Sequence, residues 1–362
     1  MKRKLTRTLR LGKVLMGGGN RLLIQSMTNA PAHDREGTLA QIQALERAGC
    51  DVVRFTVPDA QVASYVPYYK ANSRVALVAD IHFDYRLALA CVAAGIDKVR
   101  INPGNIGGKE KVRQVALACR ENGVPVRIGV NAGSLEKRLL ELHGGPTAQA
   151  LVQSALEQAA ALEEWGLSQI AVSVKSSNVQ TMIQANRLLS QQSDLPIHLG
   201  VTEAGGERMG RLKSAVGIGS LLCDGIGDTL RVSLSADVTQ EVQAARDILL
   251  ACGLLEEGVD VISCPTCGRT RIDLIGLVDQ LERALAKEDL HPGRLIRAAV
   301  MGCAVNGPGE AREADVGVAG GDGCALLFKK GQIVRKIPED QIVPALMAEI
   351  RQLATEKEDH GQ

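Results

Sequence analysis

The sequence predicts an α/β fold, a (β/α)8 (TIM) barrel followed by a smaller α+β domain. Eight short apolar runs alternate with segments of helical spacing before residue 250, and after that point the alternation stops. Hydrophobic residues make up 45% of the 362 residues but aromatic residues only 2%, which indicates an aliphatic core. Such a core suits buried parallel strands covered by helices.

The eight predicted strands are rich in Val, Ile and Leu. They are LLIQSM from Leu22, DVVRFTV from Asp51, VALVADI from Val75, DKVRINP from Asp97, PVRIGVN from Pro125, QIAVSVK from Gln169, PIHLGVT from Pro196 and DTLRVSLS from Asp228. Helical segments between them include residues 38–49, 85–95, 111–123 and 147–166, each ending on the glycine typical of a helix C-terminus. Eight strand–helix units in about 250 residues match a (β/α)8 barrel in number and size. A doubly wound open sheet is the alternative fold, but the Rossmann glycine fingerprint is missing after the first run.

After a helix predicted over residues 239–253 the pattern changes. The strand-like runs VDVISC, RLIRAAVMG, DVGVAG, CALLFKK and QIVRKI accompany two helices, RIDLIGLVDQLERALAKE and a final one from Glu339 to about Thr355. This mixture is typical of an α+β module. The sequence therefore predicts two domains, residues 1–253 and residues 254–362, with a hinge in residues 253–258.

Charge and composition exclude several classes of partner. The 42 basic and 41 acidic residues give a net charge of +1, so no global field favours nucleic acid or an anionic membrane. No run of about 18 apolar residues occurs, and the basic N-terminus lacks the apolar stretch of a signal peptide. We therefore expect a cytoplasmic protein that binds neither nucleic acid nor membrane. Nine cysteines in a reducing compartment favour metal or redox chemistry, or plain burial, over disulfides.

Charged residues late in the predicted strands indicate an anion site, because the active site of a TIM barrel lies at the C-terminal ends of its strands. Five cations come from five strands: Arg54, Arg100, Arg127, Lys175 and Arg231. Other polar residues there are Asp80, His82, Asn102, Asn131, Glu203 and Ser233. One interpretation pairs each cation with a nearby carboxylate, for example Arg127 with Glu203. For the set, convergence on one small diphosphate is favoured, because only Asp80 and Glu203 are strand-end acids.

Two further features of the barrel bear on catalysis. Asp80 and His82 lie two residues apart on one strand, so they would share a face and could donate or accept a proton. The glycines of residues 216–228 could offer backbone N–H groups to a phosphate. An ordinary glycine loop is the favoured interpretation of that segment.

Three cysteines of the second domain suggest a metal site. Cys264 and Cys267 form CPTCG at the end of one predicted strand, and Cys303 follows another. A C-x-x-C pair alone is compatible with a redox dithiol, half a zinc site or half an iron–sulfur site. No fourth Cys or His follows Cys303 at the short spacing of a structural zinc site, so a 4Fe-4S cluster with one non-thiolate position fits better. A zinc-stabilised scaffold protein and a methyltransferase barrel of pterin or zinc-thiolate type remain alternatives.

Taken together, these motifs resemble the IspG/GcpE family, the 4-hydroxy-3-methylbut-2-en-1-yl diphosphate synthases of the methylerythritol phosphate pathway. The resemblance covers essentially the whole chain through QSMTN (25–29), ADIHF (79–83), RINPGN (100–105), RIGVN (127–131), GVTEAG (200–205), DGIGDTLRVSLS (224–235), ISCPTCGR (262–269) and GCAVNGPGEA (302–311). It implies a TIM barrel followed by a sulfite-reductase-like domain. It also implies a 4Fe-4S cluster held by Cys264, Cys267, Cys303 and Glu310.

The resemblance implies a reductive conversion of 2-C-methyl-D-erythritol 2,4-cyclodiphosphate, with two electrons delivered by flavodoxin or ferredoxin. On this basis we expect the diphosphate to be held by Arg54, Arg100, Arg127, Asn131, Lys175, Arg231 and Ser233. The expected catalytic residues are Glu310 at the cluster and, for proton delivery, Glu203, Asp80 or His82. The family also implies a homodimer in which the cluster domain of one subunit meets the barrel of the other.

Overall fold

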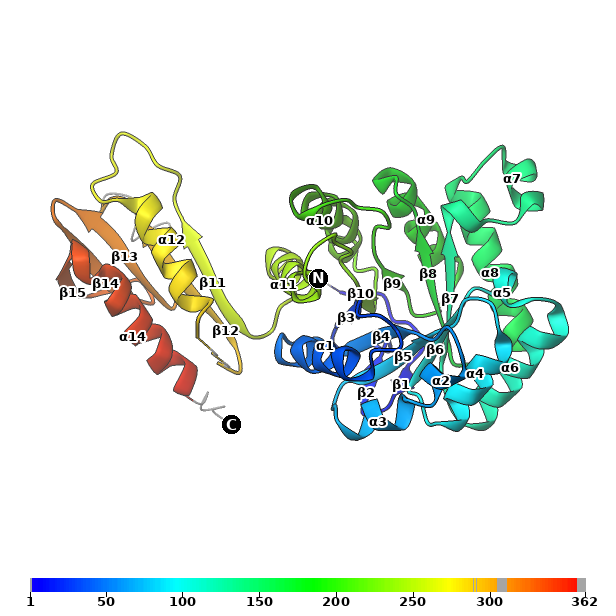
Figure 1. The fold of residues 1–362 in the computed structure, drawn as a ribbon. Helices are drawn as coiled ribbons and strands as arrows, with labels where there is room; N and C mark the ends of the chain where they lie inside the picture. The colour runs from blue at the N-terminus through cyan, green and yellow to red at the C-terminus, as the bar shows by residue number, and fades with distance from the viewer. Residues whose placement is uncertain (1, 289, 291, 305–310, 357–362) are drawn as a thin grey trace, which may run out of the picture. The chain divides into compact units, whose positions relative to one another are not determined.

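The computed structural model describes residues 2–288, 290, 292–304 and 311–356, except for the side chains of residues 103 and 104. The chain divides into two compact units, Met1–Cys252 and Gly253–Gln362 (Figure 1). No helix in the described part of the chain is long and apolar enough to cross a membrane.

The sheet of the first unit contains eight parallel strands in the order β8-β7-β6-β5-β4-β3-β10-β9. A parallel bridge between Val172 and Ile197 joins the two ends of this order, so the sheet curls into a barrel. The strands are β3 (Leu23–Met27), β4 (Val52–Thr56), β5 (Ala76–Asp80), β6 (Lys98–Ile101), β7 (Val126–Asn131), β8 (Ile170–Lys175), β9 (His198–Leu199) and β10 (Thr229–Leu230). Each lies within one of the eight predicted runs, and the predicted (β/α)8 barrel is confirmed.

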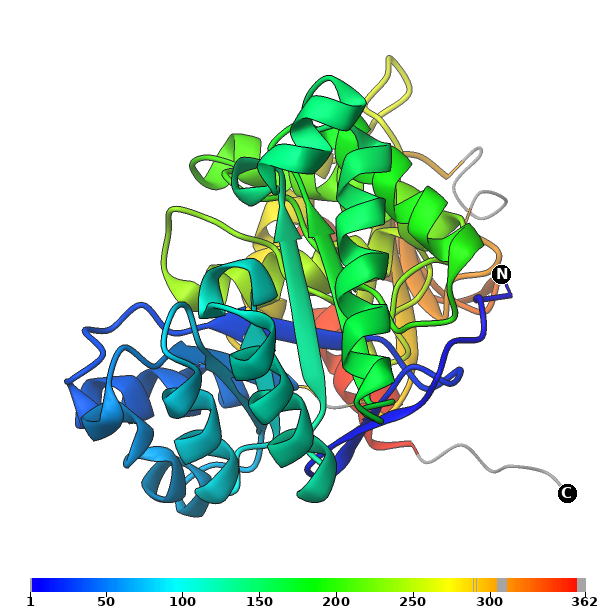
Figure 2. The same ribbon diagram turned by 90° about the vertical axis from the view of Figure 1, so that its right-hand side faces the viewer.

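Helices surround these strands (Figures 1 and 2). They are α1 (Arg35–Arg47), α2 (Ala60–Ala63), α3 (Val66–Ala71), α4 (Tyr85–Ala93), α5 (Pro103–Ile106), α6 (Lys109–Glu121), α7 (Lys137–His143), α8 (Ala148–Glu164), α9 (Val179–Gln192), α10 (Glu207–Cys223) and α11 (Val238–Ala251). Several of these helices have an N-cap side chain that accepts a hydrogen bond from a first-turn N–H, such as Asp34 for α1 and Thr147 for α8. The loop interpretation of residues 216–228 is wrong for its first half, because Gly217 and Gly219 are buried within α10.

A hairpin of β1 (Leu9–Leu11) and β2 (Val14–Met16) that the sequence did not predict precedes the barrel. Its side chains Leu9, Leu11 and Met16 are buried against apolar residues near the N-terminal ends of the strands. These residues are Leu23, Val52, Ala76, Val78 and Ala171. The hairpin thus covers the N-terminal end of the barrel with an apolar layer.

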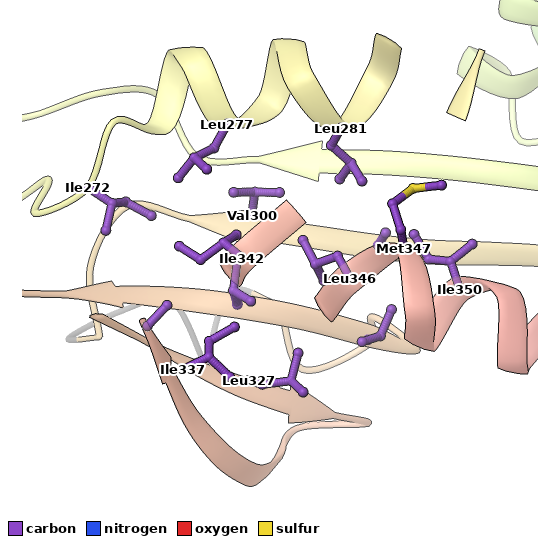
Figure 3. Packing of buried hydrophobic residues seen from close by; sticks show 14 of the residues in the cluster. Ile272, Leu277, Leu281, Val300, Leu327, Ile337, Ile342, Leu346, Met347 and Ile350 are labelled. Carbon is purple, nitrogen blue, oxygen red and sulfur yellow. The ribbon is translucent and has the colours of Figure 1, made fainter. Parts of the chain in front are cut away.

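The second unit is a five-stranded sheet in the order β11-β12-β13-β14-β15, parallel over the first three strands and antiparallel beyond. Its strands are β11 (Gly258–Ser263), β12 (Leu295–Met301), β13 (Val316–Gly321), β14 (Cys324–Lys329) and β15 (Gln332–Pro338). Helices α12 (Leu274–Leu285) and α14 (Ile342–Thr355) pack together on this sheet. In Figure 3 Leu281 of α12 and Leu346 of α14 point into the shared apolar core with Val300 of β12.

Candidate active site

The barrel interior carries charged side chains from several adjacent strands. Asp80, Arg100 and Arg127 are partners in register on three adjacent strands, so their side chains lie on the same side of the sheet. Arg127 Nη1 donates a hydrogen bond to Gln25 Oε1 at 3.3 Å. Because β7 and β3 are separated by three other strands, this bond crosses the interior, and the set faces inward.

Asp80 holds two of the predicted cations. Its Oδ1 accepts a hydrogen bond from Arg100 Nη1 at 3.1 Å, and its Oδ2 lies 3.6 Å from Arg54 Nε and 4.0 Å from His82 Nε2. Burial alone would raise the pKa of Asp80, but Arg54 and Arg100 outweigh it, and the pKa of this carboxyl lies below its ordinary value. Asp80 is therefore an ionised counter-ion, while His82 remains about half exposed at the rim.

Arg127 does not pair with Glu203, so that interpretation is wrong. Arg127 is 1% exposed and hydrogen-bonded to Gln25, whereas Glu203 is exposed, with a left-handed φ of 52°. Within the described residues the Nε of Arg127 has no hydrogen-bond partner. Burial, followed by the neighbouring Arg54 and Arg100, lowers the pKa of Arg127 well below its ordinary value. A bound anion would relieve this cost.

Two buried lysines add to the positive charge. Lys175 ends β8, and Gly200 leaves room for it, since a Cβ at position 200 would lie 2.7 Å from its Nζ. Lys98 is fully buried at the start of β6, with its Nζ 3.9 Å from Met16 Sδ. Burial and the nearby Arg127 lower the pKa of both lysines well below the ordinary value. Lys98 is not among the cations predicted from the sequence, because it stands at the start of its apolar run and not at the end.

The partner of Arg231 is a carboxylate that is not among the residues predicted from the sequence. Glu241, in the first turn of α11, is 3% exposed and accepts hydrogen bonds from Arg231 Nε and Nη2, both at 2.9 Å. The acids near the cations are therefore not limited to strand ends, because Glu241 comes from a helix. Its place in the first turn of the helix after β10 is a feature that it shares with other glutamates, such as Glu36 of α1.

The thioether of Met27 brings two of these cations together. Its Sδ lies 3.2 Å from Arg54 Nε, 3.0 Å from Arg54 Nη2 and 3.5 Å from Arg231 Nη1. A continuous set of contacts therefore runs from Arg231 through Met27 and Arg54 to Asp80 and Arg100. Among the described residues of this region, six cationic side chains face two carboxylates, Asp80 and Glu241. The cations are Arg54, Lys98, Arg100, Arg127, Lys175 and Arg231.

The remaining polar candidates lie at the same strand ends. Asn131 is the partner in register of Lys175 and is half-buried, as is Ser233. Asn102 is buried and donates a hydrogen bond from its Nδ2 to Ser134 Oγ at 3.3 Å. Together with the cations they offer neutral donors beside charged ones, an arrangement that suits an anion bearing hydroxyl groups.

The cysteines of the second unit follow neighbouring strands. Cys264 comes directly after β11 and Cys303 two residues after its parallel neighbour β12. The Gly302 N–H donates to Cys264 Sγ at 3.2 Å, and the Arg271 N–H donates to the Gly302 carbonyl at 2.9 Å, so the two segments are tied together. Cys267 is exposed in the segment between them.

Thiol donors at adjoining strand ends, with a backbone N–H directed at one sulfur, fit an iron–sulfur cluster. The fourth expected ligand, Glu310, lies outside the described residues. Among the residues that are described, no three His, Cys, Asp or Glu side chains are grouped closely enough to hold a metal ion. The donor chemistry is thus present, but the described part of the chain does not complete the site.

Both units match known protein families. A family model described as the GcpE TIM-barrel domain matches residues 6–246, and one described as the GcpE protein C-terminal domain matches residues 260–352. A relative from Caldanaerobacter subterraneus subsp. tengcongensis is 51% identical over 355 residues, which cover 98% of this chain and 99% of the relative. One from Geobacter sulfurreducens is 52% identical over 352 residues, which cover 97% of this chain and 99% of the relative. Both are named 4-hydroxy-3-methylbut-2-en-1-yl diphosphate synthase (flavodoxin).

Solved structures resemble the barrel in fold alone. Dihydropteroate synthase from Yersinia pestis with a bound pterine-sulfa conjugate has a TM-score of 0.51 at 12% identity, covering 69% of this chain and all of that one. The 3-dehydroquinate dehydratase of Geobacillus kaustophilus has a TM-score of 0.50 at 14% identity, and the match covers 68% of this chain and 96% of the dehydratase.

Proposed function

We propose, because this chain belongs to the GcpE family, that it is a 4-hydroxy-3-methylbut-2-en-1-yl diphosphate synthase. The reaction opens 2-C-methyl-D-erythritol 2,4-cyclodiphosphate, takes up two electrons and releases one hydroxyl as water, in non-mevalonate isoprenoid biosynthesis. The observation that carries the proposal is the excess of cationic side chains over carboxylates in the barrel. An anionic substrate with two phosphoryl groups supplies the missing negative charge.

Arg127 and Lys175 are the main ligands of the diphosphate in this proposal. Both are buried and neither forms an ion pair with a carboxylate within the described residues. Charge-assisted hydrogen bonds are worth about 1.5–3 kcal/mol each, so two or more would hold the substrate firmly. Arg54, Arg100 and Arg231 add further donors, and Asn131 and Ser233 bind the sugar-derived hydroxyls or the remaining phosphoryl oxygens.

The proton that leaves with the hydroxyl comes from Glu203 or His82. Asp80 is assigned a holding role, because an ionised carboxylate between Arg54 and Arg100 has no proton to give at neutral pH. Glu203 lies at the rim in a left-handed conformation that non-glycine residues rarely adopt, and such strain is frequent at functional sites. This conformation favours Glu203 over His82.

In this proposal Cys264, Cys267, Cys303 and Glu310 hold a 4Fe-4S cluster. When bound, the cluster supplies the two electrons one at a time. Glu310 would provide an oxygen ligand, which iron would hold less tightly than a thiolate. The Gly302 N–H bond to Cys264 Sγ orients that ligand and withdraws charge from the sulfur. The curated relatives carry flavodoxin in their names, so flavodoxin is the proposed electron donor, with ferredoxin as the alternative.

Iron and sulfide analysis of anaerobically purified protein tests the cluster. We expect about four irons and four sulfides per chain, and turnover of the cyclodiphosphate with reduced flavodoxin. Cys264→Ser should lose the iron, whereas Glu310→Ala should keep most of it and lose turnover. One zinc per chain without sulfide would support a zinc-stabilised scaffold protein instead. Full activity of Glu310→Ala would remove Glu310 from the mechanism.

The barrel site and the cluster are proposed to meet between two subunits of a homodimer, with movement at the 253–258 hinge. Mixing a Cys264→Ala subunit with an Arg231→Ala subunit would then restore one intact site per heterodimer. Recovered activity in the mixture, with neither variant active alone, is the expected result. A mixture as inactive as its components would contradict the shared site.

A further inference from the structure

Glu241 is a buried carboxylate to which four donors converge. Its Oε2 accepts hydrogen bonds from Arg231 Nε at 2.9 Å and Ser26 Oγ at 2.8 Å. Its Oε1 accepts from Arg231 Nη2 at 2.9 Å and from the Leu234 N–H at 3.1 Å. These donors belong to β3 and to the segment that follows β10, while Glu241 itself belongs to α11. One side chain therefore ties three segments of the barrel together.

The two bonds to Arg231 are bidentate, which fixes the plane of the guanidinium as well as its position. Only the Nη1 end remains free of Glu241, and it lies 3.5 Å from Met27 Sδ, beside which Arg54 also sits. Without the carboxylate, Arg231 would regain the rotamer freedom of a long side chain. The direction in which Arg231 presents its donors thus depends on Glu241.

We propose that Glu241 is a positioning residue of the diphosphate site: it holds Arg231 in the orientation that receives a phosphoryl group. The inference rests on the proposed function, which assigns Arg231 to the diphosphate. Glu241 itself does not touch the substrate. Its effect on the anion passes through Arg231, whose donors are then in place before the anion arrives.

A simpler role would be charge compensation, in which Glu241 only offsets one of the crowded cations. The two roles predict opposite results. If Glu241 only offset charge, its removal would leave a more positive site and tighten the binding of an anion. If Glu241 positions Arg231, its removal weakens binding, because the anion must then order a mobile side chain.

The test measures binding of inorganic pyrophosphate to the full chain by calorimetry, which needs no turnover. We expect Glu241→Gln to weaken binding about tenfold, the loss typical of one unfixed long side chain. Asp247→Asn is the matched control, because Asp247 also lies on α11 and pairs with an arginine, Arg211 of α10 at 3.1 Å, but on the exposed surface. The Asp247→Asn protein should bind pyrophosphate with the affinity of the wild type.

A double-mutant cycle with Arg231→Gln shows whether the effect passes through Arg231. The loss caused by Glu241→Gln should disappear in the Arg231→Gln background; an equal loss in both backgrounds would overturn the proposal. Glu241→Asp keeps the negative charge but shortens the side chain by one methylene, which moves the carboxylate away from Arg231. This variant should therefore also bind pyrophosphate more weakly. Unchanged affinity in that variant would show that charge alone matters, and it keeps the test decisive if Glu241→Gln does not fold.

The possible results distinguish a failure of the positioning role of Glu241 from a failure of the proposed anion site. If the wild type does not bind pyrophosphate, the anion site of the proposed function is contradicted, and the positioning role of Glu241 is contradicted as well. If the wild type binds and Glu241→Gln binds equally or more tightly, only the positioning role is overturned.

Discussion

The backbone of Gly129 on β7 lies against the guanidinium of Arg100 on β6. A Cβ atom at position 129 would come within 2.7 Å of Arg100 Nε and 2.8 Å of its Nη2, closer than real Cβ contacts allow. Asp80 holds the Nη1 of the same guanidinium at 3.1 Å. The missing side chain of Gly129 is therefore the space that Arg100 occupies.

Gly129→Ala should displace Arg100 from that space. We expect the Michaelis constant for the cyclodiphosphate to rise roughly tenfold and the free energy of unfolding to fall by about 1–3 kcal/mol, as for other overpacked sites. Steady-state kinetics and urea denaturation measure both. Gly108→Ala is the control, since a Cβ there meets nothing within 4 Å. Unaltered substrate kinetics in Gly129→Ala would mean that Arg100 has no part in binding.

The barrel could be predicted from the sequence because each of its strands is a short apolar run bounded by polar residues. The cations could be predicted for the same reason, since an arginine such as Arg127 inside an apolar run has no packing role. Parallel register places Arg100 opposite Asp80, whereas Arg54 is paired with Val78, two residues before Asp80 on the same face of β5, and reaches the carboxylate diagonally.

Other features depend on contacts that the local sequence does not encode. Glu241 lies on a helix, and its partner Ser26 lies on β3, 215 residues away along the chain, so the local sequence does not distinguish it from other first-turn glutamates. The β1–β2 hairpin has strands of three residues, too short for a periodic pattern. The glycines of α10 suggested a loop because glycine disfavours helices in isolation, but tertiary packing overrides that tendency here, with Gly217 buried against Met182 and Val201.

Replacing Asp80 by asparagine should leave Arg54 and Arg100 buried without their carboxylate. Breaking one side of a buried pair in this way costs about 3–5 kcal/mol of unfolding free energy at pH 7. The pKa of Asp80 is lowered in the folded state, so its contribution is fully present above its unfolded pKa and is lost as the pH falls through the folded value. Urea denaturation of the wild type and of Asp80→Asn should therefore show a difference in unfolding free energy that is largest near pH 7 and decreases below about pH 4. A gap independent of pH would contradict the ionic role of Asp80.

His198 on β9 should make the stability of the barrel depend on pH. It is fully buried, with Nδ1 3.4 Å from Thr229 Oγ1 and no partner at Nε2 within the described residues. Burial, then Arg127 and Lys175, lower the pKa of His198 well below its ordinary value. Below about pH 6.5 the unfolded chain binds a proton on this histidine that the folded chain does not, so stability falls by about 1.4 kcal/mol per pH unit.

His198→Asn removes that titration. The unfolding free energy of the variant should decline less steeply between about pH 6.5 and pH 5 than that of the wild type, by the contribution of one proton. Denaturant titrations at several pH values measure the two slopes. Identical slopes would show that the buried imidazole takes up a proton in the folded barrel as readily as in the unfolded chain.

Leu281 should stabilise the second unit without affecting the first. Its side chain is fully buried between α12, α14 and the sheet, so Leu281→Ala leaves a cavity and costs about 2–5 kcal/mol (Figure 3). We expect a lower iron content and earlier unfolding of the second unit, with pyrophosphate binding by the barrel unchanged. Ile275→Ala, on the same helix but 71% exposed, should change stability by less than about 0.5 kcal/mol. Loss of pyrophosphate binding in Leu281→Ala alone would mean that the two units fold as one and that the barrel needs its neighbour to keep its cations in place.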